Sequence, residues 1–152
     1  MACNSYNGQT FVDTCIPAPG ATATNATYVV SMTHYNCGNR KLCANGAYPV
    51  TADLNYKAVG APQSVGNDAY VQDILITGTC TYMPYRQNGN NGCGCNCPVT
   101  ENVWATVSVP VSSATAPTVT AGDTIAAPTN LRDCCSITNA ESIVGSFNLA
   151  TA

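Results

Sequence analysis

The side chains best suited to chemistry in this 152-residue chain are the thiols of its ten cysteines. Three of them, Cys93, Cys95 and Cys97, alternate within one short segment, and Cys134 and Cys135 are adjacent. Thiolates at such spacings can bind a soft metal ion. Zinc modules, however, usually carry C-x2-C pairs, often with histidine, whereas this chain has no such pair and a single histidine. The spacing therefore favours disulfide bonds, and we expect no metal and no cofactor.

Ring strain affects the cysteines that lie close together in the sequence. Alternate residues of an extended strand point to one face, so the cysteines of segment 93–97 bond more readily to different partners than to one another. The adjacent pair is strained in the same way, so each of its sulfurs is expected to pair elsewhere. Cys37 and Cys43 flank a short loop and form a natural disulfide pair within one chain. The remaining connectivity stays open, because many pairings are possible.

The sequence contains no recognisable catalytic constellation. A nucleophilic cysteine needs a neighbouring base, and His34 is the only histidine. A lone histidine on a strand is far more often a packed or surface residue than half of a catalytic dyad. The carboxylates form no D-x-D or E-x-x-H pattern, and no glycine-rich phosphate loop is present. We therefore expect no catalytic residue and no enzyme activity.

The low charge of the chain limits the classes of molecule that it is expected to bind. Charged residues make up 9% of the sequence, against roughly 25% in an average soluble domain, and the net charge is −3. No basic stripe is available for nucleic acid, and no apolar run of about 18 residues is present to cross a membrane. A surface of Thr, Asn, Ser and Gly has little self-repulsion and favours packing against copies of itself. We expect the partners to be further copies of this chain.

The cysteine content also bears on location, because disulfides persist in oxidising compartments. The segment that begins Met1-Ala2-Cys3 has neither the basic nor the apolar run of a secretory signal. The cysteine content thus suggests an oxidising compartment, while the sequence shows no signal that would direct the chain there. A signal trimmed from the sequence would resolve this conflict, and so would thiols that bind metal instead of forming disulfides. Release without a signal, as when a producing cell lyses around its spore, is the third resolution. We expect an extracellular protein at a cell or spore surface, with the export route left open.

Short runs of β-branched and aromatic residues, separated by Gly, Pro and Asn, predict an all-β protein. In the first run, 26–34, the side chains of Tyr28, Val30 and Met32 share one face. The further predicted strands are 50–59, 69–77, 79–83, 102–111, 118–125 and 136–147. Short strands with regular turns are typical of a β-sandwich or jelly roll.

Two parts of the chain are predicted to lie outside this core. Residues 1–25 are rich in Asn, Thr, Ala and Pro, with Phe11 and Val12 among the few apolar anchors, and are expected to form an extended N-terminal arm or connector. A frayed end or a first edge strand is the alternative interpretation of this segment. Residues 26–152 are then a single β domain, and its Cys-rich segment 84–99 is predicted to be a long exposed loop.

The aromatic residues allow two interpretations. Trp104 is expected to anchor the core. Five tyrosines could form a sugar-binding platform, although such residues more often fill strand faces or interfaces; they are Tyr48, Tyr56, Tyr70, Tyr82 and Tyr85. The platform is the main support for an alternative function, a secreted carbohydrate-binding or adhesin module.

The start Met1-Ala2-Cys3, the small Thr- and Ala-rich β domain and the cysteines on a leading arm resemble the bacterial endospore appendage (Ena-type) pilins. This resemblance covers the overall organisation of the chain. It implies a jelly-roll subunit that stacks into a fibre. It also implies that cysteines on the N-terminal connector bond to neighbouring subunits.

These observations predict a structural subunit that self-assembles into a disulfide-stabilised extracellular filament or surface layer. The arm would add a strand to a neighbour's sheet edge, with Phe11 and Val12 as its docking residues. The candidates for the cross-link between subunits are Cys3, Cys15, Cys93, Cys95, Cys97, Cys134 and Cys135. The alternatives are the adhesin module and a cytosolic thiol-rich metal-binding protein.

Overall fold

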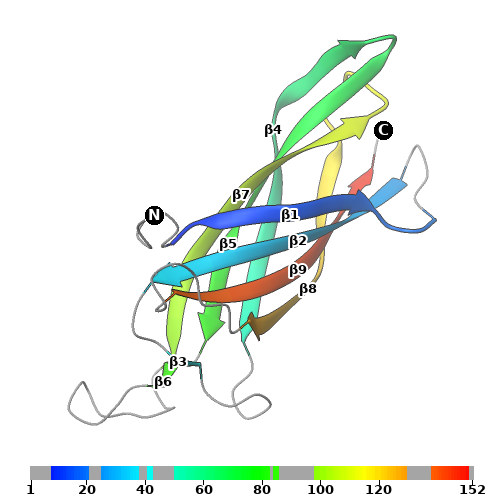
Figure 1. Cartoon of the computed structure of the whole chain (residues 1–152). Helices are drawn as coiled ribbons and strands as arrows, with labels where there is room; N and C mark the ends of the chain where they lie inside the picture. The colour runs from blue at the N-terminus through cyan, green and yellow to red at the C-terminus, as the bar shows by residue number, and fades with distance from the viewer. Residues whose placement is uncertain are drawn as a thin grey trace.

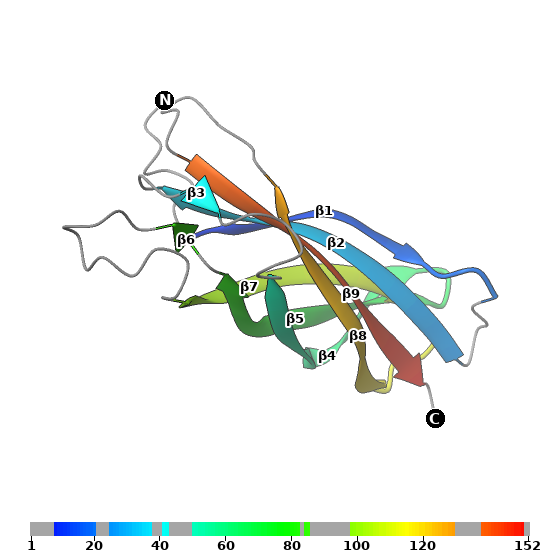
Figure 2. The same ribbon diagram turned by 90° about the horizontal axis from the view of Figure 1, so that it is seen from below.

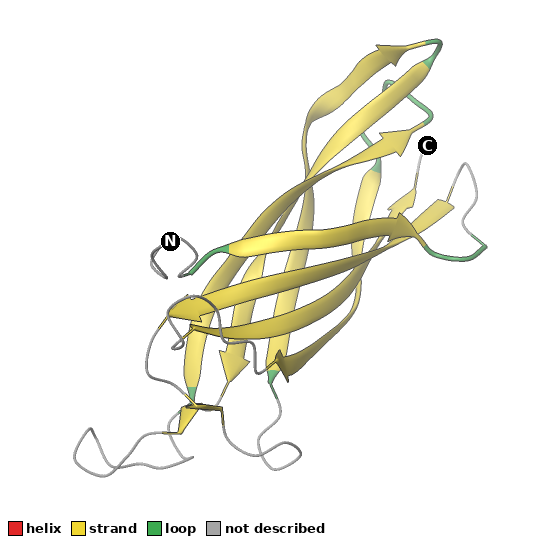
Figure 3. Ribbon diagram, viewed as in Figure 1, coloured by secondary structure: helices red, strands yellow, loops and turns green. Residues whose placement is uncertain are grey.

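The computed structural model describes residues 8–20, 25–37, 41–42, 50–82, 84–85, 98–129 and 138–150. These residues form strands and connecting turns and contain no helix (Figures 1 and 3). In chain order the strands are β1 (Thr10–Pro17), β2 (Asn25–Cys37), β3 (Lys41–Leu42), β4 (Thr51–Gly66), β5 (Ala69–Tyr82), β6 (Pro84–Tyr85), β7 (Val99–Val111), β8 (Thr118–Thr129) and β9 (Thr138–Ala150). The predicted all-β class is confirmed.

Two antiparallel sheets pack face to face as a β-sandwich (Figure 2). The four-stranded sheet has the order β1-β2-β9-β8, and the three-stranded sheet has the order β4-β5-β7. At the two edges of the sandwich, β1 lies against β7 and β8 lies against β4. The short strands β3 and β6 pair separately. The first two and last two long strands thus make one sheet, and the three strands between them make the other.

The three-stranded sheet is built around a long hairpin. Asn67 and Asp68 both have positive φ angles, 52° and 58°, as a two-residue type I′ turn requires between β4 and β5. The two runs predicted at 69–77 and 79–83 form one strand, β5, because Gly78 does not interrupt it. A Cβ atom at residue 78 would collide with the carbonyl oxygen of Asp53 on β4, so only glycine allows the strands to approach here.

The core lies between the sheets and follows the predicted alternation. Tyr28, Val30 and Met32 of β2 are buried, as their shared face predicts. Around Phe147 of β9, Tyr28 stacks at a ring-centroid distance of 5.3 Å and Tyr56 of β4 packs at 5.1 Å. Aromatic pairs at these distances add to the stabilisation from buried area. The aromatic cluster of Tyr28, Tyr56 and Phe147 therefore joins strands of both sheets.

The prediction that Trp104 anchors the core is wrong. Along β7, Val103 and Ala105 are buried, and the residues between them face outward. Trp104 is one of these intervening residues and is 62% exposed. Strand periodicity therefore outweighs the hydrophobicity of the side chain, since successive residues must point to opposite faces.

Part of the predicted arm belongs to the sandwich. Residues 10–17 form β1, which pairs with β2 of the same chain and is an edge strand of the four-stranded sheet. A bulge interrupts the pairing between Val12 and Thr14. The ends of the predicted loop 84–99 also lie in strands, at β6 and at the start of β7, while residues 86–97 lie outside the described residues.

Candidate functional site

The buried histidine and glutamate of the core, with a buried cysteine, lie at one end of the sandwich. We call this the cysteine end and define it by His34, Cys80, Glu101 and Glu141, near the ends of β2 and β5 and the starts of β7 and β9. In the pairing of the strands, His34 lies opposite Glu141, and Cys80 lies opposite Glu101. The strand alternation turns His34, Cys80 and Glu141 into the core, where all three are fully buried.

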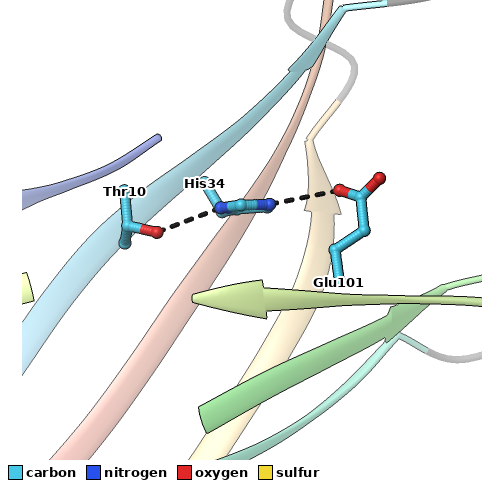
Figure 4. A network of polar contacts seen from close by, with 3 residues as sticks. All are labelled: Thr10, His34 and Glu101. Atoms are coloured by element: carbon cyan, nitrogen blue, oxygen red, sulfur yellow. Dashed lines mark hydrogen bonds and ion pairs between the residues drawn. The ribbon is translucent and has the colours of Figure 1, made fainter. Parts of the chain in front are cut away.

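The two ring nitrogens of His34 contact the neighbouring strand β1 of its own sheet and β7 of the facing sheet (Figure 4). Its Nδ1 is hydrogen-bonded to Oγ1 of Thr10 on β1 at 3.0 Å. Its Nε2 lies 3.2 Å from Oε2 of Glu101 on β7, across the sandwich. Glu101 retains 25% side-chain exposure, so this pair lies at the boundary between core and solvent. The geometry suits a polar tie that fixes the first strand and the facing sheet to β2.

Cys80 is the buried thiol of the site. Burial is the main cause that raises its pKa to about 12, and the nearby carboxylates of Glu141 and Glu101 contribute to the same rise. The thiolate is the form that attacks electrophiles and binds metals, so a thiol with this pKa is a packed hydrophobic group at neutral pH. In the part of the chain that the structure describes, no group of three or more His, Cys, Asp or Glu side chains is placed to hold a metal ion.

Among the described residues, the free cysteines are Cys15 and Cys80, and no disulfide occurs. Cys15 faces the core from β1 and is partly buried, and this burial raises its pKa. Cys37 is the last residue of β2. The other predicted disulfide and cross-link residues lie outside the described residues; they are Cys3, Cys43, Cys93, Cys95, Cys97, Cys134 and Cys135. The predicted pair Cys37 and Cys43, and the cross-links, therefore remain predictions.

The strand ends nevertheless place constraints on these cysteines. Four stretches outside the described residues follow Cys37, Leu42, Tyr85 and Thr129. In each case the next described residue also lies at the cysteine end. Residues 1–7 precede Gly8, whose amide donates to the carbonyl of Tyr35 at the same end. All cysteines except Cys15 therefore belong either to strands at this end or to stretches of sequence that begin or end at such strands. The sequence alone did not reveal this common placement, because it depends on strand direction.

The predicted arm-docking residues point to opposite sides of β1. Val12 faces inward and packs against the core. Phe11 faces outward and is 40% exposed, with the edge of its ring against Tyr35 of β2 at a centroid distance of 5.7 Å. Val12 is therefore the residue that anchors β1 in the apolar interior of the sandwich.

Two of the five tyrosines named for a sugar-binding platform lie in the core. Tyr82 is buried and Tyr56 packs in the aromatic cluster, so neither presents its ring to a surface ligand. Tyr70 is partly buried, and Tyr48 and the side chain of Tyr85 lie outside the described part of the chain. Of the described aromatic rings, Trp104 is more exposed than Phe11, at 62% against 40%.

No protein-family model, curated protein or solved structure matches this chain. Within the described residues, no helix is long and apolar enough to span a membrane.

Proposed function

We propose that the chain is a structural subunit that self-assembles into a disulfide-stabilised filament or layer on the outside of a cell or spore. The observation that carries this proposal is the position of β1. It is an edge strand, it pairs with β2 alone, and the chain reaches β2 through residues 18–24. An edge strand of this kind can leave its own β2 and occupy the same position on another copy.

The contacts of β1 indicate what an exchanged strand would bring to the accepting copy. Its backbone would pair with β2, as in β-augmentation, and its inward side chains, Val12 and Cys15, would fill the same apolar site. Thr10 would hydrogen-bond to His34 of the accepting copy. Because contacts within a copy and between copies are equivalent, protein concentration and the connecting segment decide which form is populated.

Disulfides would make such an exchange permanent. Cys3 precedes β1 by a few residues, so an exchanged β1 carries it to the cysteine end of the accepting copy. The candidate partners are the thiols of segments 93–97 and 134–135, whose flanking strands begin or end there. Cys15 is the less suitable cross-linker, because it faces the core and burial raises its pKa. We therefore place the cross-link between copies at Cys3.

Two deletions test the exchange in opposite directions. Removing residues 1–20 takes away the donated strand and should leave only monomers on sedimentation. Removing residues 19–26 leaves no loop between Ala18 and Thr27, whose backbones are hydrogen-bonded, so β1 cannot fold back onto its own β2 and polymers should form at lower concentration. Polymer formation by the first variant, or unchanged assembly of the second, would contradict strand exchange.

The covalent part is tested on non-reducing gels. Wild-type polymer should give a ladder that collapses to one monomer band with reductant, and Cys3→Ser should abolish the ladder. Cys15→Ser is the matched control and should leave the ladder intact. A wild-type protein that remains a monomer and is retained by a polysaccharide column, or that carries stoichiometric metal, would instead support one of the alternative functions.

A further inference from the structure

The outer face of the four-stranded sheet carries an aliphatic stripe. Its members are Ile16 of β1, Val29 of β2, Val144 of β9 and Ile125 of β8. Ile16 pairs with Val29, and Ile125 pairs with Val144, while Val29 and Val144 are diagonal neighbours on adjacent strands. Ile125 is 67% exposed and Ile16 is 57% exposed. A contiguous apolar stripe across a whole sheet is more than scattered surface hydrophobicity and indicates an interaction surface.

The outer face of the three-stranded sheet carries the exposed ring of Trp104. Its register neighbours are Thr77 of β5 and, one strand further, Asn55 of β4. The next row of the same face contains Lys57, Leu75 and Thr106. The ring therefore projects from a flat, largely uncharged surface. A large aromatic residue in such a setting is typical of the centre of a protein interface.

Charged side chains lie on both faces, and the tryptophan face carries Asp53 and Asp73 as well as Lys57. On the striped face, Asp13 is exposed and accepts a hydrogen bond from Thr33 at 2.8 Å. On the tryptophan face, Lys57 is the only basic residue, and the described residues contain no ion pair for it. Asp73, which lies on the same face, accepts a hydrogen bond from Ser108. Because Asp13 and Lys57 lie on opposite outer faces of the sandwich, they can attract each other only between copies.

The spacing of these features is the same on both faces. On the striped face, Asp13 of β1 contacts Thr33 of β2, and Thr33 lies opposite Ser142 of β9. Val144 is the next outward residue of β9 after Ser142. Asp13 and Val144 are therefore two strands apart and one row of side chains apart. On the other face, Lys57 and Trp104 are also two strands and one row apart. With strands about 4.8 Å apart and rows about 6.8 Å apart, each separation is roughly 12 Å. Two points at equal separations can be superposed by rotating one face on the other.

We propose that the striped face of one copy stacks on the tryptophan face of the next. Trp104 packs on Val144 and Ile125, and Lys57 pairs with Asp13. The two surfaces differ, so the contact is heterologous, and each copy keeps one face free for a further copy. This inference rests on the proposed function, because it describes a second contact within the same assembly, in addition to the exchange of β1.

The test is a charge swap in the full-length chain, assayed in reducing buffer so that disulfides do not trap polymers. Asp13→Lys and Lys57→Asp should each raise the concentration needed for assembly roughly tenfold, because like charges then face each other. The double variant Asp13→Lys/Lys57→Asp should return to within about twofold of wild type, since the exchanged charges attract again. Restoration distinguishes a direct contact from misfolding.

Controls and a second variant complete the experiment. Gln63→Lys and Ser64→Asp add single charges of either sign at the exposed tip of the β4–β5 hairpin and should leave assembly unchanged. Trp104→Ala should raise the assembly concentration roughly thirtyfold, as expected for a central interface tryptophan. Assembly of the Asp13 and Lys57 single variants at the wild-type concentration would overturn the inference, as would failure of the double variant to recover.

The outcomes separate this inference from strand exchange. If wild-type protein never assembles, both proposals fail. If deletion of residues 1–20 abolishes assembly while the charge and tryptophan variants assemble normally, only face stacking fails. If the charge and tryptophan variants lose assembly while the variant lacking residues 19–26, which keeps Asp13, assembles as the wild type does, only strand exchange fails. Trp104-dependent binding of monomers to a polysaccharide, with unaltered assembly, would overturn stacking and assign the ring to a glycan.

Discussion

The two ends of the sandwich are stabilised by different kinds of interaction. At the cysteine end, ionisable side chains are buried together, and His34 joins the sheets through Glu101. At the opposite end, which we call the hairpin end, the hydroxyl of Tyr28 donates to the carbonyl of Pro110 at 3.1 Å. There the buried amide of Gln72 donates to the carbonyls of Val59 and Gly60, where β4 bulges.

This difference between the two ends shows that the contacts of buried ionisable groups lie at the cysteine end, whereas the hairpin end is held by hydrogen bonds between neutral groups. Neutral hydrogen bonds and aromatic packing do not change with pH in the usual range, so the hairpin end and the middle of the core should be insensitive to pH. Charges and thiols at the cysteine end can change state. Assembly chemistry is proposed for this same end, and its stability should therefore depend on solution conditions. The following predictions test this division.

The largest loss of stability is expected from the aromatic cluster. Phe147→Ala removes a fully buried ring that contacts Tyr28 and Tyr56 and should lower the free energy of unfolding by about 3–5 kcal/mol. Denaturant unfolding of the monomer in reducing buffer would measure this. The loss should be the same at pH 7 and pH 8.5, and a pH-dependent loss would argue against the proposed separation.

The next largest effect is expected at the tie between the sheets. Glu101→Ala leaves the ring of His34 buried without its partner across the sandwich and should cost about 1–3 kcal/mol. Glu101→Gln is the matched control, because an amide keeps a hydrogen-bonding group at the same place and should cost less. Equal losses in the two variants would show that the packing of this side chain, rather than its polar contact, stabilises the end.

Alkaline pH should weaken the fold through Cys80. Its pKa rises from 9.0 to about 12 on folding, so the folded state keeps a proton that the unfolded state releases. This contribution is complete below pH 9 and is lost as the pH rises from 9 towards 12. By pH 10.5 the loss should be about 1–2 kcal/mol. Cys80→Ala should flatten the dependence, although Tyr28 and Tyr56, whose pKa values burial also raises, should keep part of it.

The smallest effect on the fold is expected at the surface. Trp104→Ala should change the free energy of unfolding of the monomer by less than about 0.5 kcal/mol, because the ring is mostly exposed. Circular dichroism melts of dilute protein would measure this. A large destabilisation would mean that the ring supports its own sheet, and the assembly defect predicted for this variant would then lose its meaning.

Local sequence patterns predicted much of the fold. Alternation located the long strands, including the buried face of Tyr28, Val30 and Met32. Alternation along 102–111 also contains the correct position of Trp104, because Val103 and Ala105 on either side of it share the buried face, whereas the size of the Trp104 side chain alone favours the core. The first edge strand was considered only as an alternative for residues within the arm, because β1 has few apolar residues and an irregular bulge.

The candidate site was much harder to predict. The sequence drew attention to His34, but Glu101 lies 67 positions away and reaches it across the sandwich. Contacts between sheets depend on strand order and register, which no local pattern contains. The same limit applies to the aliphatic stripe, whose members come from four strands and become neighbours only once β2 pairs with β9. The sequence thus indicated which side chains could take part in polar contacts, but it did not indicate which of them lie together in the folded molecule.

The pairing of β2 with β9 has a consequence for how the molecule forms. These strands pair along thirteen residues, from Asn25 with Ala150 to Cys37 with Thr138, and so join opposite parts of the chain. Such a topology has high contact order, and folding on the scale of milliseconds to seconds is expected. On the ribosome, β1 and β2 must wait as an isolated hairpin until β9 emerges. The docking site for a donated strand is therefore completed last, which delays association until the rest of the chain can fold.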